Sequence, residues 1–378
     1  MLVTIDAGAL GYPMRTGIGR YLESVLLPLA DMAGGLTEFV LLSGRPLCNR
    51  AALDLVKAGR MRARTVNFPS LYAWQQTGMG AQILRLRPDV HFTPDGLLPL
   101  VFRGKSVGAL QDVLWKRHPE TLSRHIRMVF GLRQKASLKR LTVALTGSES
   151  NRREMRRVFG PVAEKIRVAP LFGLDHAMFR PYEDRDEAAA KAFREKYGLS
   201  GDFLFCAGNL MPHKNFRAVP EAMAQLWRRG AALPDLLVAG LGDPATVLAG
   251  LPEGFPTKRV KTPGYLSDEE LLLAYRLALA FVFPSLYEGY GLPVLEAMAS
   301  GTPVIHADAT SLPEAAGGAG LPFDPRVADA LADALEKVIE DAALREELTR
   351  KGLERTKGLS WEKSAAVLWE AINQAANA

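Results

Sequence analysis

Short runs of apolar and β-branched residues alternate with helix-like patterns along most of the chain, in two successive series. Strands that alternate with helices form parallel sheets with both faces covered. Two such series predict an α/β protein of two doubly wound, Rossmann-like domains. The 378 residues agree with this, at roughly 150 residues per domain. We expect strands at 2–6, 39–42, 90–93, 107–110, 142–146 and 166–169, and then at 203–207, 236–239, 280–283 and 303–306.

A charged segment, 181–187, separates the two series. Charged and proline-containing stretches of this kind are typical of linkers between domains. The sequence therefore predicts one domain over residues 1–180, a second over 181–358, and a last segment, 359–378, that holds an amphipathic helix at 361–374. The other helices expected are at 19–29, 149–159, 188–197, 268–277 and 293–299.

Several classes of protein are excluded by composition. No apolar run reaches the ~18 residues that a membrane span needs, and the first residues lack the basic region of a secretory signal. The two cysteines, Cys48 and Cys206, lie far apart, which excludes a disulfide framework and a zinc site built from cysteines. We expect a cytoplasmic protein, either free or peripheral on the inner face of the cytoplasmic membrane.

The charge is unevenly distributed. Residues 1–180 contain 27 Lys and Arg against 13 Asp and Glu, whereas the remainder contains 20 against 28. The most basic stretch runs from Arg103 to Arg140, with apolar residues among the cations, and a second cluster spans Arg152 to Arg157. Three interpretations stay open: a solvated helix face, an anionic membrane surface, or nucleic acid. The last lacks a recognisable reading module, so no nucleic-acid partner is expected.

The most informative segment follows the predicted strand 280–283. A glycine-punctuated loop leads to Pro293, which suits the first turn of a helix because its missing N–H costs nothing there. Ligands of open α/β sheets bind beyond the carboxyl ends of strands. Gly289 and Gly291 allow close approach of the backbone to a ligand. The N–H groups of Gly291, Leu292 and Val294 are expected to form an anion site at the helix N-terminus.

Two carboxylates flank this anion site, Glu288 in the loop and Glu296 about one turn into the helix. A carboxylate accepts hydrogen bonds well from a pair of sugar hydroxyls. One glutamate can therefore hold a sugar and the other a ribose, with phosphates between them on backbone amides. The alternative is that Glu288 merely caps the helix and that Glu296 is a surface residue.

Two further segments also read as a strand, a glycine loop and a helix start. In the first, Gly208 and Asn209 follow a strand, and Lys214 comes at the end of the loop, where a point charge could neutralise a diphosphate. In the second, Gly17 and Gly19 could present N–H groups to the same phosphates. The dinucleotide fingerprint with its third glycine is absent, which disfavours a dehydrogenase.

At these residues the sequence resembles the retaining glycosyltransferases of family 4, which have the GT-B fold. The signature is Glu288-x7-Glu296 within Glu-Gly-Tyr-Gly-Leu-Pro-Val-Leu-Glu-Ala-Met. The segments 16–21, 212–215, 311–325 and 360–362 also match, so the resemblance covers nearly the whole chain. It implies two Rossmann-like domains that face a central cleft, with a final helix that returns to the first domain.

The resemblance also implies roles for individual residues. Glu288 would contact hydroxyls of the transferred sugar, Glu296 the donor ribose and Lys214 the diphosphate. The diphosphate would further meet the amides of Gly291 and Leu292 and, from the first domain, Gly17. Leu266 would lie near the base. The remaining donor-binding residues expected in the two loops are Gly208, Asn209, Gly289 and Tyr290.

The chain departs from the family pattern at two places. Family members often carry Arg where Asn209 stands, and His-Asp where Gln111-Asp112 stands. Glutamine cannot take a proton at neutral pH. Either Asp112 acts at the reacting centre, or a hydrogen bond from Gln111 is sufficient there, or the chain is less active than its relatives. The Asp184-Arg185-Asp186 triplet lies in the charged linker, and we expect no metal and no cofactor.

These observations predict a metal-independent, retaining hexosyltransferase. It would use a nucleotide-diphosphate sugar, with GDP-mannose the first choice and a UDP-hexose or dTDP-rhamnose next. The acceptor would be a lipid-linked or envelope saccharide bound by the basic first domain. The alternative is a catalytically weak donor-binding subunit of a glycan-assembly complex.

Overall fold

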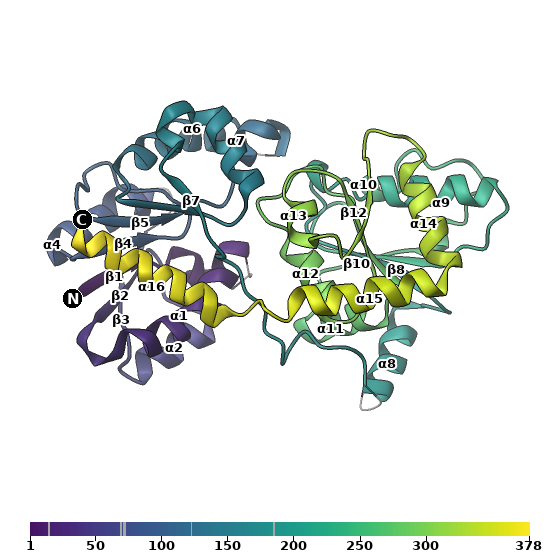
Figure 1. The fold of residues 1–378 in the computed structure, drawn as a ribbon, viewed down its shortest axis with the longest axis horizontal. Helices are drawn as coiled ribbons and strands as arrows, with labels where there is room; N and C mark the ends of the chain where they lie inside the picture. Colours follow the sequence, from purple (N-terminus) through teal and green to yellow (C-terminus); the bar gives the residue numbers. More distant parts are fainter. Residues whose placement is uncertain (14–15, 69, 71–72, 122, 184–185) are drawn as a thin grey trace. The chain divides into compact units, whose positions relative to one another are not determined.

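A computed structural model of the chain describes residues 1–13, 16–68, 70, 73–121, 123–183 and 186–378. The chain divides into two compact units (Figure 1). Unit 1 comprises Met1–Gly173 together with Leu359–Ala378, and unit 2 comprises Leu174–Gly358. Each unit is a parallel sheet with helices packed against it, as the alternation of strand and helix patterns predicts.

Unit 1 is built on a seven-stranded sheet whose pairings are all parallel. The chain starts in the middle of this sheet and builds first toward one edge and then, from β4 onward, toward the other. Across the sheet, the strands are β3 (Arg62–Thr65), β2 (Glu38–Ser43), β1 (Leu2–Asp6), β4 (Val90–Thr93), β5 (Ser106–Ala109), β6 (Val143–Thr146) and β7 (Ile166–Val168). The helices are α1 (Gly17–Ala33), α2 (Arg50–Lys57), α4 (Met79–Leu86), α5 (Leu114–Arg117), α6 (Arg124–Arg140), α7 (Glu149–Phe159) and α16 (Trp361–Asn377), with a π-helical turn, η3 (Trp74–Gly78), before α4.

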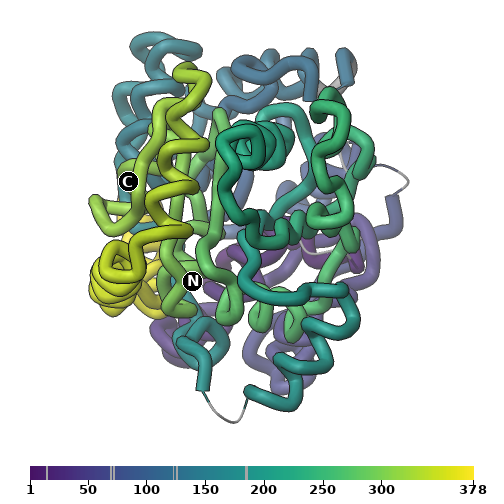
Figure 2. Tube along the Cα trace, turned by 90° about the vertical axis from the view of Figure 1, so that its right-hand side faces the viewer, coloured from purple at the N-terminus to yellow at the C-terminus, as the bar shows by residue number. Residues whose placement is uncertain are grey.

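Unit 2 repeats this plan with six parallel strands. Here the direction of building reverses between β8 and β11, which are neighbours. Across the sheet, the strands are β10 (Val260–Gly264), β9 (Asp235–Ala239), β8 (Phe203–Ala207), β11 (Ala280–Phe283), β12 (Val304–Ala307) and β13 (Leu321–Phe323). The helices are α8 (Glu187–Tyr197), α9 (Ala218–Arg228), α10 (Ala245–Leu248), α11 (Asp268–Leu277), α12 (Leu292–Ala299), α13 (Leu312–Ala316), α14 (Ala330–Glu340) and α15 (Ala342–Thr356), the last two drawn in yellow-green in Figure 2.

The central strands carry the core of each unit. Strands β4, β6, β8, β9, β11 and β12 are buried along their whole length. A strand covered on both faces has no solvent side, so it reads as a continuous apolar run and is easily found in the sequence. In unit 2, Phe205, Phe281 and Tyr275 pack with ring centres 5.2–5.7 Å apart.

The sequence analysis did not predict three strands. All three lie at a sheet edge: β3 in unit 1, and β10 and β13 in unit 2. β3 carries Arg62 and Arg64, β10 carries Lys261 and Pro263, and the three-residue β13 has a proline at its centre. Charges and prolines are common on edge strands, where they prevent pairing with other chains. The same residues remove the apolar pattern by which a strand is recognised.

The division between the units falls at Gly173, ahead of the charged segment 181–187. A buried ion-pair network explains why this segment belongs to unit 2. The Asp186 carboxylate accepts from Arg180 at 2.8 and 2.9 Å, and Arg276 on α11 reaches both the Arg180 carbonyl oxygen at 3.0 Å and Asp186 at 3.4 Å. The Arg180 guanidinium holds the pKa of Asp186 down, at about 2.

Helix α16 completes unit 1. Its N-cap is Ser360, and a Cβ at Gly173 would collide with the Ser360 backbone. Trp361 packs edge-on against Tyr21 of α1, with ring centres 6.4 Å apart. Trp369 packs in the same way against Phe39 of β2, at 6.3 Å. The last helix therefore covers part of the first sheet.

Candidate active site

The candidate site in unit 2 lies at the carboxyl ends of β8 and β11, where the strand order reverses. Ligands of open α/β sheets bind at such a switch point. The loop after β8 and the loop after β11 are joined there by their backbones. The Leu286 N–H donates to the His213 carbonyl oxygen at 2.8 Å, and the Ser285 hydroxyl donates to the same oxygen at 3.3 Å.

Lys214 and Glu288, which the sequence places in these two loops, form an ion pair. The Lys214 Nζ lies 2.6 Å from the Glu288 Oε1. Both side chains are largely covered, at 17% and 14% exposed. The Lys214 Nζ also lies 5.2 Å from the centre of the Phe283 ring, which favours the cation through the negative face of the ring. The two groups are thus held against each other at the switch point.

The backbone of Glu288 is fixed by two hydroxyl groups. Its N–H donates to the Thr310 Oγ1 at 3.0 Å, and its carbonyl oxygen accepts from the Ser311 Oγ at 2.9 Å. Thr310 has a φ of 48°, an uncommon conformation for a residue that is not glycine. Sequence reasoning assigned no role to Thr310 or Ser311, because neither hydroxyl lies at a recognisable spacing from Glu288.

Glu296 lies on α12 and is only 3% exposed. Its Oε2 accepts a hydrogen bond from the Tyr275 hydroxyl of α11 at 3.1 Å. The alternative that Glu296 is a surface residue is therefore wrong. The alternative that Glu288 caps the helix is wrong as well, because Gly291 is the N-cap and α12 has no side-chain cap. Tyr275 could not be recognised as a partner of Glu296 from the sequence, because it lies on a different helix.

The first turn of α12 departs from the predicted anion site in one respect. Gly291 has a φ of 108°, which requires glycine. Within the described residues, the N–H groups of Gly291 and Leu292 meet no protein acceptor. The Val294 N–H is not available, contrary to the prediction, because the turn tightens and this group donates to the Gly291 carbonyl oxygen at 3.0 Å. Gly289 and Tyr290 are half-buried in the same loop, and burial raises the pKa of Tyr290.

The loops after β8, β9 and β10 lie against one another. Gly208 has a φ of 141°, and its N–H donates to the Ala239 carbonyl oxygen at 2.9 Å. A Cβ at Gly240 would collide with the Gly208 carbonyl, so the backbones touch. Asn209 is exposed. Leu266, predicted near the base, is 5% exposed, so its side chain belongs mostly to the packing of the loop.

In unit 1, Gly17 opens α1 and is exposed. The N–H of Gly19, which was expected to face phosphate, donates instead to the Oγ1 of the N-cap residue Thr16 at 3.0 Å. That part of the prediction is wrong, because the threonine cap satisfies the orphan donor of the first turn. The neighbouring Arg15 lies outside the described residues.

Gln111 and Asp112 follow β5 in unit 1. The Gln111 Nε2 donates to the Pro94 carbonyl oxygen at 2.8 Å, which fixes the orientation of the amide. The Asp112 Oδ1 accepts from the N–H of Leu114, the first residue of the short helix α5, at 2.9 Å. The Gln111 side chain is held firmly, and the carboxylate beside it has a local structural bond.

The charged linker offers no metal site in the part that the structure describes. Asp184 and Arg185 lie outside the described residues, and Asp186 is bonded to Arg180 and Arg276. Over the described ranges, no group of three or more His, Cys, Asp or Glu side chains converges as a metal would need. His118, a further histidine of unit 1, pairs with Glu120 at 2.9 Å.

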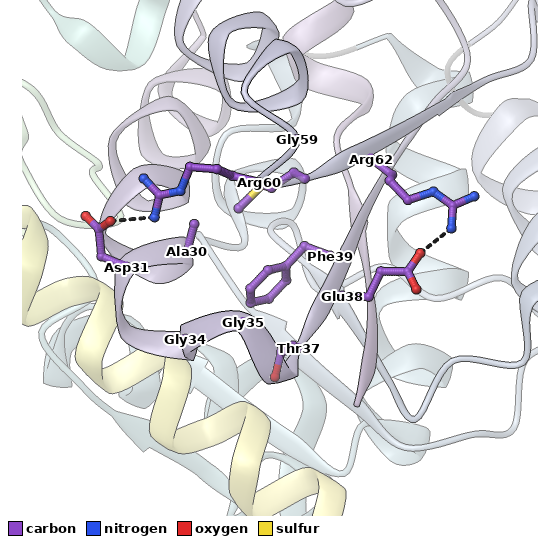
Figure 3. A pocket seen from close by; sticks show the side chains of 11 residues that line it. Ala30, Asp31, Gly34, Gly35, Thr37, Glu38, Phe39, Gly59, Arg60 and Arg62 are labelled. Carbon is purple, nitrogen blue, oxygen red and sulfur yellow. Dashed lines mark hydrogen bonds and ion pairs between the residues drawn. The ribbon is translucent and has the colours of Figure 1, made fainter.

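A cavity of about 390 Å³ lies at the opposite end of the first sheet (Figure 3). It is bordered by the amino-terminal ends of β2 and β3 and by two ion pairs, Arg60 with Asp31 at 2.5 Å and Arg62 with Glu38. Parallel sheets bind ligands at the carboxyl ends of their strands, and each charge here already has a partner. This cavity is therefore separate from the candidate site.

Comparison with known proteins gives a relative over nearly the full length. The chain is 31% identical over 369 residues to the O-antigen chain mannosyltransferase B of Escherichia coli, covering 93% of this chain and 94% of the relative. Residues 190–355 match the family model described as glycosyl transferases group 1. The chain belongs to this family. The sequence resemblance to the family is thereby confirmed, and the chain is a glycosyltransferase.

Solved structures confirm the GT-B fold. Sucrose-phosphate synthase from Thermosynechococcus elongatus superposes with a TM-score of 0.75 at 21% identity, covering 99% of this chain and 98% of that one. Anabaena HepE in complex with UDP and glucose superposes with a TM-score of 0.69 at 17% identity, covering 98% and 99%. Among the residues that the structure describes, no helix has both the length and the apolar character to cross a membrane.

Proposed function

We propose that the chain transfers a hexose from a nucleotide-diphosphate sugar to a saccharide acceptor, with retention of the anomeric configuration and without a metal. GDP-mannose is the first donor to test, since the full-length relative is named as a mannosyltransferase of the O-antigen chain. The acceptor is a lipid-linked or envelope saccharide. The single observation that carries the proposal is the Lys214–Glu288 pair at the switch point.

The pair supports a division of work when a donor binds. A diphosphate brings at least two negative charges, and it would compete with Glu288 for the Lys214 ammonium. The Glu288 carboxylate would then be released to accept hydrogen bonds from hydroxyls of the transferred sugar. One residue meets the developing charge of the leaving group, and the other orients the sugar. The N–H groups of Gly291 and Leu292 would add donors to the phosphates.

Glu296 suits the ribose of the donor. Its carboxylate is buried, and the Tyr275 hydroxyl occupies one oxygen at 3.1 Å. A buried carboxylate that is fixed by one donor keeps a defined orientation, so it can accept from a pair of vicinal hydroxyls at low entropic cost. Tyr275 is then a support for Glu296 that lies outside the signature segment.

The acceptor is proposed to reach unit 1 from an anionic membrane surface. One exposed stripe of α6 supports this, because its members are spaced three or four residues apart and combine cations with apolar side chains. Met128 and Leu132 are 58% and 71% exposed. The stripe consists of Arg124, Met128, Leu132, Lys135 and Lys139. Basic helix faces with exposed apolar groups suit a headgroup layer.

The second basic cluster does not strengthen the membrane proposal. Arg157 and Arg117 both pair with Glu154, and Arg152 pairs with Glu149 at 2.7 Å. These cations are thus already paired with carboxylates within unit 1. The membrane proposal therefore rests on the α6 stripe, and co-sedimentation with vesicles of anionic lipid tests it. Leu132→Ser should weaken binding, whereas Leu84→Ser, a 54%-exposed position on α4, should not.

A thermal-shift screen of nucleotides and nucleotide sugars tests the donor. A ligand at 100 times its dissociation constant adds ~2.7 kcal/mol to stability, which is readily measured. We expect stabilisation by GDP and GDP-mannose that is lost in Lys214→Ala. Stabilisation by a UDP or dTDP series instead would change the donor but keep the reaction class. Binding without any turnover would favour the donor-binding subunit over the enzyme.

A further inference from the structure

Two acidic side chains of unit 1 converge on one amide nitrogen. Asp6 ends β1, and Asp95 follows the neighbouring strand β4. The Gln75 Nε2 donates to the Asp6 Oδ2 at 3.2 Å and to the Asp95 Oδ2 at 2.8 Å. Asp6 and Gln75 are each 3% exposed. Two carboxyl groups on a single buried donor are close enough to repel strongly if both are ionised.

The surroundings of Asp6 favour its protonated form up to near neutral pH. Burial and the nearby Asp95 charge raise the pKa of Asp6 to about 7. The Gly8 N–H, which donates to the Asp6 Oδ1 at 3.0 Å, the Gln75 amide and the Arg133 charge on α6 act in the opposite direction. Asp6 is thus surrounded by one acid, two hydrogen-bond donors and one cation that act on its pKa.

The Asp95 carboxylate also fixes the turn in which it lies. Its Oδ1 accepts from the Thr93 hydroxyl at 2.7 Å and from the Leu97 N–H at 2.9 Å. Gln75 itself lies in the π-helical turn η3. Such turns often occur at functional sites. From it, Gln75 reaches the acids, and its neighbour Gln76 accepts from the Leu100 N–H at 3.1 Å.

This turn positions Gln111. The residue directly before Asp95 is Pro94, and its carbonyl oxygen accepts from the Gln111 Nε2 at 2.8 Å. A continuous path of hydrogen bonds and one peptide therefore joins the acid pair to the Gln111 amide. Displacement of Asp95 would move the Pro94 carbonyl and release the amide from its fixed orientation.

We propose that Gln75, clamped between Asp6 and Asp95, is a positioning residue for Gln111, and that the clamp holds only while Asp6 keeps its proton. The inference rests on the proposed function in one respect, namely that Gln111 takes the role at the reacting centre that the family resemblance implies. Loss of the proton leaves two negative charges on one donor, one of them buried, which pushes the Pro94–Asp95 turn away from Gln75.

Three variants of the full chain test the clamp. Asp6→Asn removes the charge that titrates. Its carbonyl can accept from the Gly8 N–H, but its NH2 takes the place of the Oδ2 that accepts from the Gln75 Nε2, so the informative quantity is its pH dependence and not its protection at one pH. Gln75→Met removes the donor and nearly conserves the volume. Gln76→Met is the matched control, because it lies on the same turn and bonds the same connection but touches neither acid. Hydrogen exchange of the segments 94–98 and 109–113 is measured from pH 5.5 to pH 8.5.

The expected result is a pH profile that depends on Asp6. After correction for intrinsic exchange, both segments of the native chain should lose protection as pH rises through about 7, while Asp6→Asn should keep it. Gln75→Met should lose about tenfold protection already at pH 6, and Gln76→Met should affect residues near Leu98 and Leu100 alone. A native-like pH profile in Asp6→Asn, or equal effects of the two glutamine variants, would overturn the proposal.

A second measurement connects the clamp to the reaction. Release of nucleoside diphosphate from GDP-mannose, UDP-glucose and dTDP-rhamnose is followed over the same pH range. We expect kcat to fall above pH 7 in the native chain, to stay level in Asp6→Asn, and to drop in Gln75→Met with KM for the donor unchanged. If none of the three donors is turned over, the proposed function fails on these probes while the exchange experiment still decides the clamp. If turnover follows pH identically in native and Asp6→Asn chains, the positioning of Gln111 is refuted.

Discussion

The two units differ in the charges that they place at the point where the strand order of each sheet reverses. In unit 2, the loops beyond β8 and β11 bring together opposite charges, Lys214 and Glu288, at 2.6 Å. In unit 1, the ends of β1 and β4 bring together like charges, Asp6 and Asp95, with an uncharged amide between them. Both places are points where the strand order reverses, so the fold supplies the position and the side chains decide the chemistry.

This difference teaches how each unit should respond to pH. An opposite-charge pair is stable over the wide range in which both partners are ionised, whereas a like-charge pair needs a proton to hold together. In unit 2, the Lys196 ammonium lowers the pKa of Glu270 to about 2, in the same direction as Asp186. Unit 2 should therefore lose stability on the acid side, while the Asp6 site of unit 1 should lose it as pH rises from about 4 to about 7.

The largest expected effect comes from breaking the opposite-charge pair. Lys214→Ala should reduce donor turnover by about 10²- to 10³-fold, as removal of one preorganised donor to a developing charge does. Lys214→Arg should retain part of the activity. Donor turnover is the measurement, and Lys191→Ala, an exposed lysine of α8, is the control. Undiminished turnover in Lys214→Ala would separate the pair from the reaction.

Substitutions of Glu296 and of its hydrogen-bond partner Tyr275 should have smaller effects, and these should differ from each other. Glu296→Gln should raise KM for the nucleotide sugar about tenfold, since a neutral amide accepts less strongly from ribose hydroxyls. Tyr275→Phe removes one hydrogen bond to the carboxylate and leaves the carboxylate itself in place, so the increase should be smaller. Initial-rate kinetics over donor concentration measure both variants. A fall of about tenfold in kcat with KM unchanged would instead mean that Glu296 acts on the reacting sugar rather than on the ribose.

The alkaline response of unit 1 is a stability effect. Because the pKa of Asp6 is raised from 3.8 to about 7, the folded chain holds this proton longer than the unfolded chain does. The contribution to stability is complete below pH 4 and is lost as pH rises to 7. Asp6→Asn should remove this loss, which amounts to a few kcal/mol, and its Tm should exceed that of the native chain increasingly from pH 5 to pH 8. Asp54→Asn, at an exposed site on α2, should change neither the loss of stability with rising pH nor the Tm.

The acid response of unit 2 should be the smallest. Arg180 lowers the pKa of Asp186 from 3.8 to about 2, so this carboxylate stabilises the folded chain above pH 4, and the contribution is lost between pH 4 and pH 2. Asp186→Asn should lower Tm by a few degrees at pH 7 and by less at pH 3. Asp202→Asn is a suitable control because it is exposed. A Tm difference that grows on acidification would contradict the comparison.

Much of the fold could be predicted because buried parallel strands read as apolar runs. The strands β1, β4, β8 and β11 were predicted with the bounds that the structure has. The edge strand β3 could not be found, since Arg62 and Arg64 make its four residues look like a loop. Local propensity and apolar pattern indicate which segments are buried. An edge strand such as β3 forms because it pairs with a neighbouring strand, and this neighbour cannot be recognised from the local sequence.

The same contrast holds for the two sites. Lys214 and Glu288 could be singled out because each lies in the loop of a strand–glycine loop–helix pattern. The loops that follow adjacent parallel strands lie at the same edge of the sheet, so the two residues come together. Asp6, Gln75 and Asp95 carry no motif, and only the placement of β4 beside β1 unites them. Likewise, the tightened first turn of α12 withdraws the Val294 N–H from the anion site, and this depends on local backbone geometry.

The return of α16 to unit 1 has a consequence for synthesis on the ribosome. At about 5–20 residues per second, residues 174–358 are synthesised before Trp361 and Trp369, which pack against Tyr21 and Phe39. Every element of unit 2 is therefore made before unit 1 receives its last helix. A chain that ends at residue 358 would keep all of unit 2 and would leave Tyr21 and Phe39 without these two aromatic partners.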